Sequence, residues 1–351
     1  MRRTIKFAAG FLLFVFPAFA GSPPIPTMHE RVAVTPLVAD QQAAAPNTDP
    51  NLVNSWGLSR DDEGLLWVAD NGTDLATSYD SNTGLPTGTA IHIPMGAPTG
   101  NVYVTNGIDF QISENGKSGP AELLFDTESG AIEGWNPDVD ATNAVVAIDN
   151  SAKGAVYKGL TLDTGTQQLY AANFTQNQVE VYDTSFKLVN TFTDPSLPAG
   201  FATFNVMDVN GTLYVSFAKQ GKVCCDEIDR PHLGYVDVFD ASGHLKQRLI
   251  SKGKLSAPWG MSIAPLGFGE LAGSLLVGNF GDGRINAFDS ASGTFLGTLR
   301  NANGSILKLD GLWGLLNGPS DSQVTFSAGP GDESHGLVGS LSPSQMNPVK
   351  R

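Results

Sequence analysis

The chain has 351 residues, of which 41% are hydrophobic and 9% aromatic, enough to build one large β domain or two ordinary ones. Its formal net charge is −14, with 35 acidic residues against 21 basic ones. Nucleic acids and anionic membranes bind basic surfaces, so this composition argues against either as a partner. An acidic surface is compatible with cation binding, although it more often serves solubility.

The first twenty residues predict a secretory signal peptide. Residues 2–6 carry three basic side chains, an apolar run covers 7–16, and residues 18–20 read Ala-Phe-Ala, a small-residue cleavage site. The apolar run is too short to span a bilayer comfortably, and no second run of that kind follows. We therefore expect export, to the periplasm or the extracellular space, after cleavage near Ala20, with no membrane span in the mature chain.

After the leader, residues 21–29 read as a linker, and residues 31–40, RVAVTPLVAD, alternate as a single strand. Six units follow, each with three short alternating segments bounded by Gly, Asn or Asp, which is typical of strands and turns. We expect the first strands of these units at 55–59, 106–112, 157–163, 204–209, 259–264 and 311–316.

A glycine recurs at the start of these first strands. It stands at Gly57, Gly107, Gly159, Gly260 and Gly314, and Val206 holds its place in the fourth unit. A spacing near fifty residues is the period of a propeller blade. We predict an all-β fold, a six-bladed β-propeller over 30–345 with a short tail at 346–351.

The last unit supplies three strands, which leaves one strand missing from its blade. Because an unpaired blade edge favours aggregation, the strand at 31–40 is expected to complete the last blade and to close the ring from the N-terminal side.

Two stretches, 159–183 and 260–289, resemble NHL-type repeats: a Gly-led apolar strand, a strand ending in Ala-Asn-Phe or Gly-Asn-Phe, and an alternating strand ending in Tyr-Asp or Phe-Asp. With the motifs NSWGLS, DNGTD, NGIDF and GPGDESHG, the mature chain is similar to a family of exported bacterial propellers of the NHL and gluconolactonase-like superfamily. The resemblance implies the fold and says little about chemistry. Gluconolactonase-like propellers use Asp and Asn side chains to hold a cation that polarises a carbonyl group.

The middle strands end in a recurring polar set, Asp70-Asn71, Asn173 and Asn279, which superposed blades would gather at one mouth of the channel. Asp109 and Asp208 are expected near the innermost strands. Oxygen ligands of this kind suit calcium, and Asn71, Asn173, Asn279 and Asp208 are the candidate ligands. Two other readings stay open, because such residues also hydrogen-bond their own turns and can recognise a polar ligand without a metal.

The densest polar cluster is GPGDESHG at 329–336, which a glycine-flanked loop would project from the ring. Glu333 or His335 is the first choice for a general base if the protein is an enzyme. The alternative is an ordinary solvated hairpin turn.

Trp56, Trp259 and Trp313 each precede a first-strand glycine, which favours packing between blades; stacking on a sugar at the channel mouth is the alternative. The only cysteines, Cys224 and Cys225, are adjacent and provide no disulfide framework, although they could form a vicinal disulfide.

The leading functional hypothesis is therefore an exported, non-enzymatic propeller that binds a protein, a small molecule or a carbohydrate through its channel face. The alternative is a calcium-dependent hydrolase or lactonase of the gluconolactonase-like type.

Overall fold

The computed structural model describes residues 28–222 and 225–344. The predicted signal peptide, residues 21–27 of the predicted linker and the predicted tail lie outside the described residues, as does Cys224.

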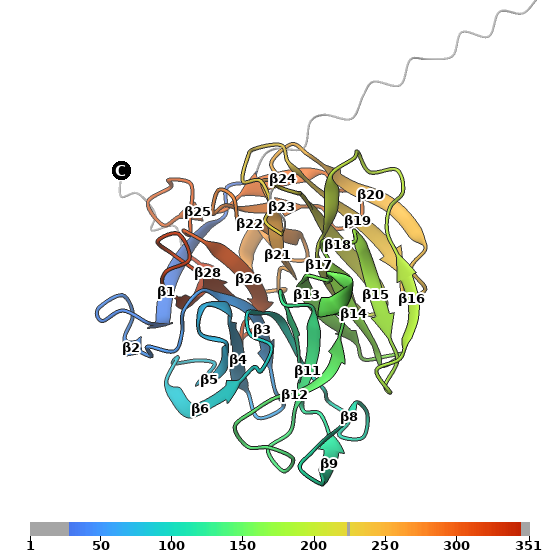
Figure 1. Cartoon of the computed structure of the whole chain (residues 1–351). Coiled ribbons are helices and arrows are strands. Elements are labelled where there is room, and N and C mark those ends of the chain that lie inside the picture. Colours follow the sequence, from blue (N-terminus) through green and yellow to red (C-terminus); the bar gives the residue numbers. More distant parts are fainter. Residues whose placement is uncertain (1–27, 223–224, 345–351) are drawn as a thin grey trace, which may run out of the picture.

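The described chain forms six sheets arranged around an axis, which confirms the predicted six-bladed β-propeller (Figure 1). We number the blades by the order of their innermost strands. Blade 1 contains β3 (Ser55–Arg60), β4 (Leu65–Asp70), β5 (Leu75–Asp80) and β6 (Pro86–His92). Blade 2 contains β7 (Pro98–Tyr103), β10 (Leu123–Thr127), β11 (Ala131–Trp135) and β12 (Val145–Asp149). Blade 3 contains β13 (Tyr157–Asp163), β14 (Gln168–Asn173), β15 (Gln178–Tyr182) and β16 (Leu188–Phe192).

Blade 4 contains β17 (Phe201–Val209), β18 (Thr212–Lys219), β19 (Gly234–Asp240) and β20 (Leu245–Ser251). Blade 5 contains β21 (Pro258–Ile263), β22 (Leu275–Asn279), β23 (Ile285–Phe288) and β24 (Phe295–Thr298). Blade 6 contains β26 (Leu312–Asn317), β27 (Val324–Ala328), β28 (Leu337–Pro343) and β1 (Arg31–Ala39), extended by β2 (Asn47–Thr48) and β25 (Arg300–Asn301). A hairpin of β8 (Gln111–Glu114) and β9 (Lys117–Pro120) stands apart from the blades.

Among the described residues, the helices are three single 3₁₀ turns: η1 (Asn71–Thr73), η2 (Ser151–Lys153) and η3 (Gly269–Leu271). In the part of the chain that the structure describes, no helix has the length and apolar character needed to cross a membrane.

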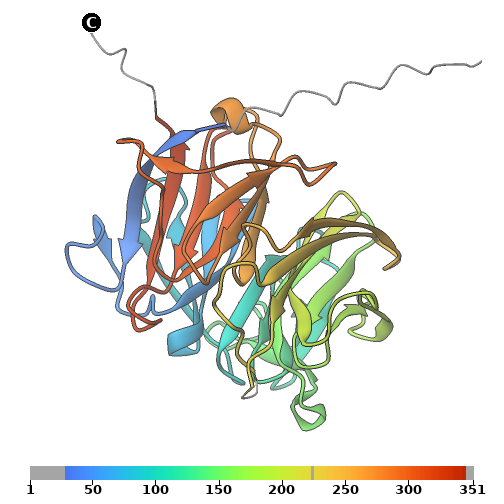
Figure 2. The same cartoon turned by 90° about the horizontal axis from the view of Figure 1, so that it is seen from above.

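Blade 6 is completed from the opposite end of the chain. β1 pairs antiparallel with β28, from Val32 opposite Pro343 to Ala39 opposite Leu337, with one bulge near Pro36. Both views show the blue first strand running beside the red strands of this blade (Figures 1 and 2). The predicted closure of the ring by the N-terminal strand is therefore confirmed.

The first strand expected for blade 2 was wrong. The innermost strand is β7, at 98–103, whereas residues 106–112 form a turn and the start of the separate hairpin. The Asn106 side chain accepts hydrogen bonds from the backbone N–H groups of Ile108 and Asp109, and Gly107 has a φ of +63°. An Asn-Gly turn of this kind breaks a strand, so the alternation on either side of it was misread.

The inner-strand glycines let neighbouring blades approach closely. A Cβ atom on Gly57 would lie 2.6 Å from the carbonyl oxygen of Thr99 on β7. In blade 2 the inner-strand glycine is Gly100, not the predicted Gly107. In blade 4 the corresponding position is occupied by Asn205, not by the predicted Val206. Asn205 donates a hydrogen bond from Nδ2 to the carbonyl oxygen of Trp259 at 2.9 Å, so a side chain bridges the blades where glycine would allow backbone contact.

The core consists of seven apolar clusters, among the described residues, that follow the ring. Six of them each fill one interface between neighbouring blades, for example the cluster around Leu276 and Phe326 between blades 5 and 6. The seventh lies on the axis and is mostly aromatic. The axial cluster divides the channel into two ends with different chemistry.

Candidate functional site

The channel is closed in its middle by aromatic side chains. Three of them, Trp56, Trp259 and Trp313, directly precede an inner-strand glycine and are almost fully buried. The rings of Trp56 and Trp313 stack with centroids 3.4 Å apart, and Trp259 meets Trp313 edge-on at 5.8 Å. The predicted packing of the tryptophans between blades is therefore confirmed. We call the following set the aromatic plug: Trp56, Phe174, Phe204, Trp259, Phe280 and Trp313.

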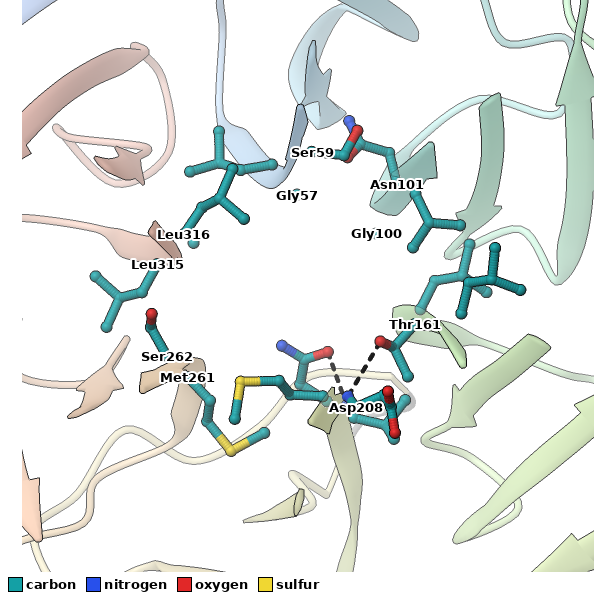
Figure 3. A pocket seen from close by; sticks show the side chains of 18 of the residues that line it. Gly57, Ser59, Gly100, Asn101, Thr161, Asp208, Met261, Ser262, Leu315 and Leu316 are labelled. Carbon is teal, nitrogen blue, oxygen red and sulfur yellow. Dashed lines mark hydrogen bonds between the residues drawn. The ribbon is translucent and has the colours of Figure 1, made fainter. Parts of the chain in front are cut away.

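Beyond the plug, at the C-terminal ends of the inner strands, the channel opens into a cavity of about 540 Å³. We call this the open end. Residues from all six inner strands line the open end, and Figure 3 shows Leu315, Leu316, Met261, Thr161 and Asp208 around it. Rigid strands, not loops, therefore set most of the shape of the cavity.

The lining of the open end mixes apolar and hydroxyl-bearing side chains with few charges. The hydroxyl of Ser262 donates to the Asn317 side chain at 2.8 Å, and the Asp208 backbone N–H donates to the Thr161 hydroxyl at 3.2 Å. The charged groups in the described lining are Arg60 and Asp208, which carry opposite signs. Arg60 is already held by the carbonyl oxygens of Asn317 and Gly318.

Burial acts on both charged groups of the open end. It lowers the pKa of the Arg60 guanidinium, and together with repulsion from Asp163 it raises the pKa of Asp208. Desolvation disfavours the charged form of each group. The open end is thus a mildly desolvated, nearly neutral cavity.

The opposite side of the plug, which we call the loop end, contains a buried lysine. Lys158 directly precedes Gly159, and its side chain is 3% exposed. Its Nζ donates to Glu128 Oε1 at 2.6 Å and lies 3.7 Å from Glu227 Oε2. The same ammonium lies 5.1 Å from the ring centroid of Trp56, within the range of a cation–π contact.

Three further acidic side chains approach the same lysine: Asp226, Asp229 and Glu333. Burial raises the pKa of Glu227 to about 7, although Lys158 lowers it. Burial alone would lower the pKa of the Lys158 amine, but Glu227 and Glu128 outweigh that effect and the pKa is raised. The lysine therefore stays charged, while Glu227 titrates near neutral pH.

The loop between β18 and β19 lies over the loop end. Gln220 Nε2 donates to the carbonyl oxygen of Phe174, a plug residue, at 2.8 Å. Residues of this loop and of blade 3 line a second hollow of about 330 Å³, whose walls include Phe174, Thr175 and Asp226. Cys225, in the same loop, is disulfide-bonded.

The polar residues expected at the ends of the middle strands all lie at the loop end, each with hydrogen-bond partners. Asp70 accepts from Thr77 Oγ1 at 2.7 Å, and Asn71 donates to Glu128 Oε2 at 3.0 Å. Asn173 donates to Glu180, and Asn279 donates to the carbonyl oxygen of Lys254. Burial raises the pKa of Asp70 well above its usual range. Asn173 also bonds its own turn, because its Oδ1 accepts from the backbone N–H of Gln176 at 3.3 Å. The contacts named for Asp70 and Asn71 go to side chains of a neighbouring strand and of a neighbouring blade.

The other two predicted channel residues lie elsewhere. Asp208 lines the open end, on the far side of the plug from the three asparagines, so the structure does not bring the four candidate calcium ligands together. Asp109 accepts a hydrogen bond from Asn106 in the turn after β7 and is not on an inner strand. Within residues 28–222 and 225–344, no cluster of three or more His, Cys, Asp or Glu side chains has the arrangement of a metal site.

Glu333 and His335 both lie in the turn between β27 and β28, but their side chains have different partners. Asp332 and Glu333 both adopt positive φ values, +53° and +64°, and Glu333 reaches the surroundings of Lys158 and Glu128. Burial is the main cause of its raised pKa. His335 instead pairs through Nδ1 with Asp40 at 2.8 Å, beside the closing strand. The GPGDESHG loop thus contributes Glu333, but not His335, to the loop end.

Lys158, Glu128 and Glu227 come from three different blades, and none of them was predicted from the sequence. One signal was available: Lys158 precedes Gly159 just as tryptophan precedes the glycine in three other blades. A lysine in a position otherwise held by buried aromatics indicates a buried charge with carboxylate partners.

No family model matches the chain. It is 34% identical over 326 residues to Uncharacterized protein L690 of Acanthamoeba polyphaga mimivirus, covering 88% of this chain and 85% of that protein. Uncharacterized protein R648 of the same virus is 31% identical over 334 residues, covering 88% and 80%. The chain belongs to the family of these mimivirus proteins. Neither relative carries a described activity, so membership of the L690 and R648 family assigns none.

Solved structures with this arrangement show the fold alone, because their sequence identity is low. The WD40 β-propeller domain of Doa1 has a TM-score of 0.52 at 10% identity, covering 83% of this chain and 79% of that one. Streptogramin B lyase has a TM-score of 0.51 at 10% identity, covering 89% and 97%. The Neurospora crassa Pan2 WD40 domain has a TM-score of 0.50 at 13% identity, covering 91% and 98%.

Proposed function

We propose that the protein binds a small, neutral, polar molecule, a sugar or a polyol, in the open end of its channel. The observation that carries this proposal is the cavity of about 540 Å³ lined by all six inner strands. Small-molecule sites typically measure roughly 300–1,000 Å³ and combine apolar walls with a few placed polar groups. The open end has both properties.

The charge of the lining favours a neutral ligand. Arg60 and Asp208 offset each other, and the two terminal nitrogens of Arg60 are already hydrogen-bonded to backbone oxygens. An anionic or cationic ligand would leave one of these groups facing a like charge. Hydroxyl groups of a sugar can instead both donate to and accept from Thr161, Ser262 and Asn317.

Filling the cavity tests the proposal. Thr161→Trp places a bulky ring among the lining residues, and Thr191→Trp places the same ring on the exposed outer strand β16 of the same blade as a control. Isothermal titration calorimetry with maltose, trehalose and inositol should show binding of at least one by the wild type and by Thr191→Trp, and loss with Thr161→Trp. Binding that survives Thr161→Trp, or binding of charged probes only, would contradict the proposal.

The second candidate is the calcium-dependent hydrolase or lactonase that the NHL and gluconolactonase-like resemblance implies. It is favoured by one observation: Asn71, Asn173, Asn279 and Glu333 all lie at the loop end, where Glu333 has a raised pKa. The thermal midpoint of the leader-free protein, measured with EDTA and with calcium, tests it. A rise with calcium that Asn173→Ala and Asn279→Ala abolish supports the second candidate, and an unchanged midpoint counts against it.

We also propose that the protein is exported. This proposal is supported by three features of a signal peptide: the basic residues at 2–6, the apolar run at 7–16 and the small-residue cleavage site before Gly21. Mass spectrometry of the N-terminus after expression in a bacterial host should find a chain that begins at or near Gly21.

A further inference from the structure

Three side chains at the loop end, from blades 1, 2 and 3, meet at one carboxylate. Lys158 Nζ donates to Glu128 Oε1 at 2.6 Å, and Asn71 Nδ2 donates to Glu128 Oε2 at 3.0 Å. Because both donors bind the same carboxylate, the lysine amine and the asparagine amide are neighbours across it. The fold thus brings together a nucleophile, a proton acceptor and an amide carbon that the nucleophile can attack.

The orientation of the Asn71 amide is set by a chain of hydrogen bonds. The indole nitrogen of Trp313 can only donate, and it donates to Asn54 Oδ1 at 3.1 Å. The Asn54 Nδ2 atom is therefore free to donate to Asn71 Oδ1, also at 3.1 Å, and Asn71 Nδ2 is left to face Glu128. A donor on the Asn71 carbonyl oxygen favours attack at Cγ, because it stabilises the negative charge that then forms on that oxygen.

The Lys158 amine is shielded from water and held in place. Its side chain is 3% exposed, and Nζ lies 5.1 Å from the ring centroid of Trp56 and 5.8 Å from that of Phe174. Glu227 and Glu128 keep the amine protonated, so a free amine forms only when Glu128 accepts its proton. A reaction that each molecule completes once can use that small fraction, because its groups are already in position.

The backbone around Asn71 restrains a competing reaction. Asn71 precedes Gly72, and attack of the Gly72 backbone nitrogen on the Asn71 side chain would form a cyclic imide. The Gly72 N–H donates instead to the carbonyl oxygen of Val53 at 3.0 Å, and the Asn71 N–H donates to that of Asn54 at 3.1 Å. These two bonds hold the 3₁₀ turn η1 in place and leave the Asn71 amide to the lysine.

We propose that Lys158 and Asn71 become joined by an amide bond, with Glu128 transferring the protons. Glu128 takes a proton from Lys158, and the lone pair of the free Nζ attacks Asn71 Cγ to form the Nζ–Cγ bond. Glu128 gives that proton to Asn71 Nδ2 and accepts a second one from Nζ. The Cγ–Nδ2 bond then breaks, its electron pair leaves with the nitrogen as ammonia, and Glu128 releases the second proton to water. Nothing is oxidised or reduced, and no further reactant is needed.

The product is a covalent link between blades 1 and 3, and the structure shows both side chains before the bond forms. The link replaces the charge of Lys158 by a neutral amide. Glu227 tolerates this loss by taking up a proton, because burial already raises its pKa to about 7. The link closes a loop of the chain from 71 to 158, which restricts the unfolded state as a disulfide does.

The test is mass spectrometry of the leader-free protein, kept folded at pH 8 and then denatured. The wild type should be lighter than its sequence by one molecule of ammonia. After digestion with trypsin, a branched peptide should join residues 61–117, which contain Asn71, to residues 154–187, in which Lys158 is no longer cleaved. Protein kept unfolded in urea should retain its full mass, because the reaction needs the folded arrangement.

Variants assign the roles. Lys158→Met and Glu128→Gln should each retain the full mass of their sequence, because one lacks the nucleophile and the other the proton acceptor. Lys153→Met is the matched control: its amine also donates to an asparagine, Asn150, but without a carboxylate between them, so this variant should lose ammonia as the wild type does.

Three results would overturn the proposal: a folded wild type of full mass, loss of ammonia that persists in Lys158→Met, or loss of ammonia without the branched peptide. The last two are the results expected of a cyclic imide at Asn71. The branched peptide is sought in the wild type, so the test remains decisive even where a variant does not fold.

Discussion

The two ends of the channel are built on the same six strands yet differ in chemistry. The open end begins after the inner-strand glycines and is hollow, with one cation and one anion in its described lining. The loop end begins before those glycines, where tryptophan, phenylalanine and lysine side chains fill the axis. The comparison teaches that a one-residue step along a repeated strand decides whether the axis is packed or open, because the position before the glycine carries a large buried side chain in most blades and the glycine carries none.

The largest effect on the contrast between the two ends is expected from deleting a side chain of the aromatic plug. Trp313 is 1% exposed and stacks on both Trp56 and Phe280. Trp313→Ala should lower the free energy of unfolding by about 3–5 kcal/mol, the usual cost of deleting a buried aromatic side chain. Leu316→Ala at the open end, where the side chain is only partly buried, should cost about 1 kcal/mol. Urea denaturation measures both, and similar losses would show that the two ends are equally packed.

The next largest effect should come from removing the buried cation. Lys158→Met keeps the volume but leaves Glu128 and Glu227 without their cation, and breaking a buried ion pair costs about 3 kcal/mol. Arg60→Met at the open end removes two hydrogen bonds to backbone oxygens and should cost about 1 kcal/mol. Urea denaturation compares the two variants, and a larger loss of unfolding free energy for Arg60→Met than for Lys158→Met would contradict the prediction.

Titration of Glu227 sharpens the contrast further. Its pKa in the folded protein is about 7, above the 4.5 of a free glutamate, so the unfolded chain releases this proton first as the pH rises. Wild-type stability should therefore fall between pH 4.5 and pH 7, and the stability of Glu227→Gln relative to wild type should rise by up to roughly 3 kcal/mol over that window. Denaturation at pH 4, 5.5, 7 and 8 measures the difference, and a flat difference would contradict the burial argument.

The smallest effect is expected at the open end. Asp208→Asn keeps the acceptor for the Gly211 backbone N–H, and the side chain is only partly buried. The free energy of unfolding of the Asp208→Asn variant should differ from that of the wild type by less than about 0.5 kcal/mol. A loss as large as that of Lys158→Met would show that the open end also depends on a specific charge.

The fold could be predicted because its signals are local and repeated: alternating strands, turn residues and glycines at a near-constant spacing. Blade 2 shows the limit of this reasoning. Its turn at Asn106-Gly107 also carries a glycine, and nothing local distinguishes that glycine from the inner-strand Gly100.

The loop end was only partly predictable for a different reason. Asn71 and Glu333 were chosen from their strand-end and loop positions, and both lie there. Lys158, Glu128 and Glu227 meet only because the ring brings blades 2, 3 and 4 together, and no spacing along the chain encodes that contact. A cluster formed by residues that are distant along the chain can be identified only from the three-dimensional structure.

The pairing of β1 with β28 also determines how the molecule would respond to mechanical load. Because Val32 lies opposite Pro343, the outgoing ends of these two strands stand side by side on blade 6. A force that pulls the two ends apart loads the hydrogen bonds between the strands one after another, as in a zipper, rather than all together in shear. The ring should therefore open at this seam at low force, while the five blades built from contiguous segments remain folded.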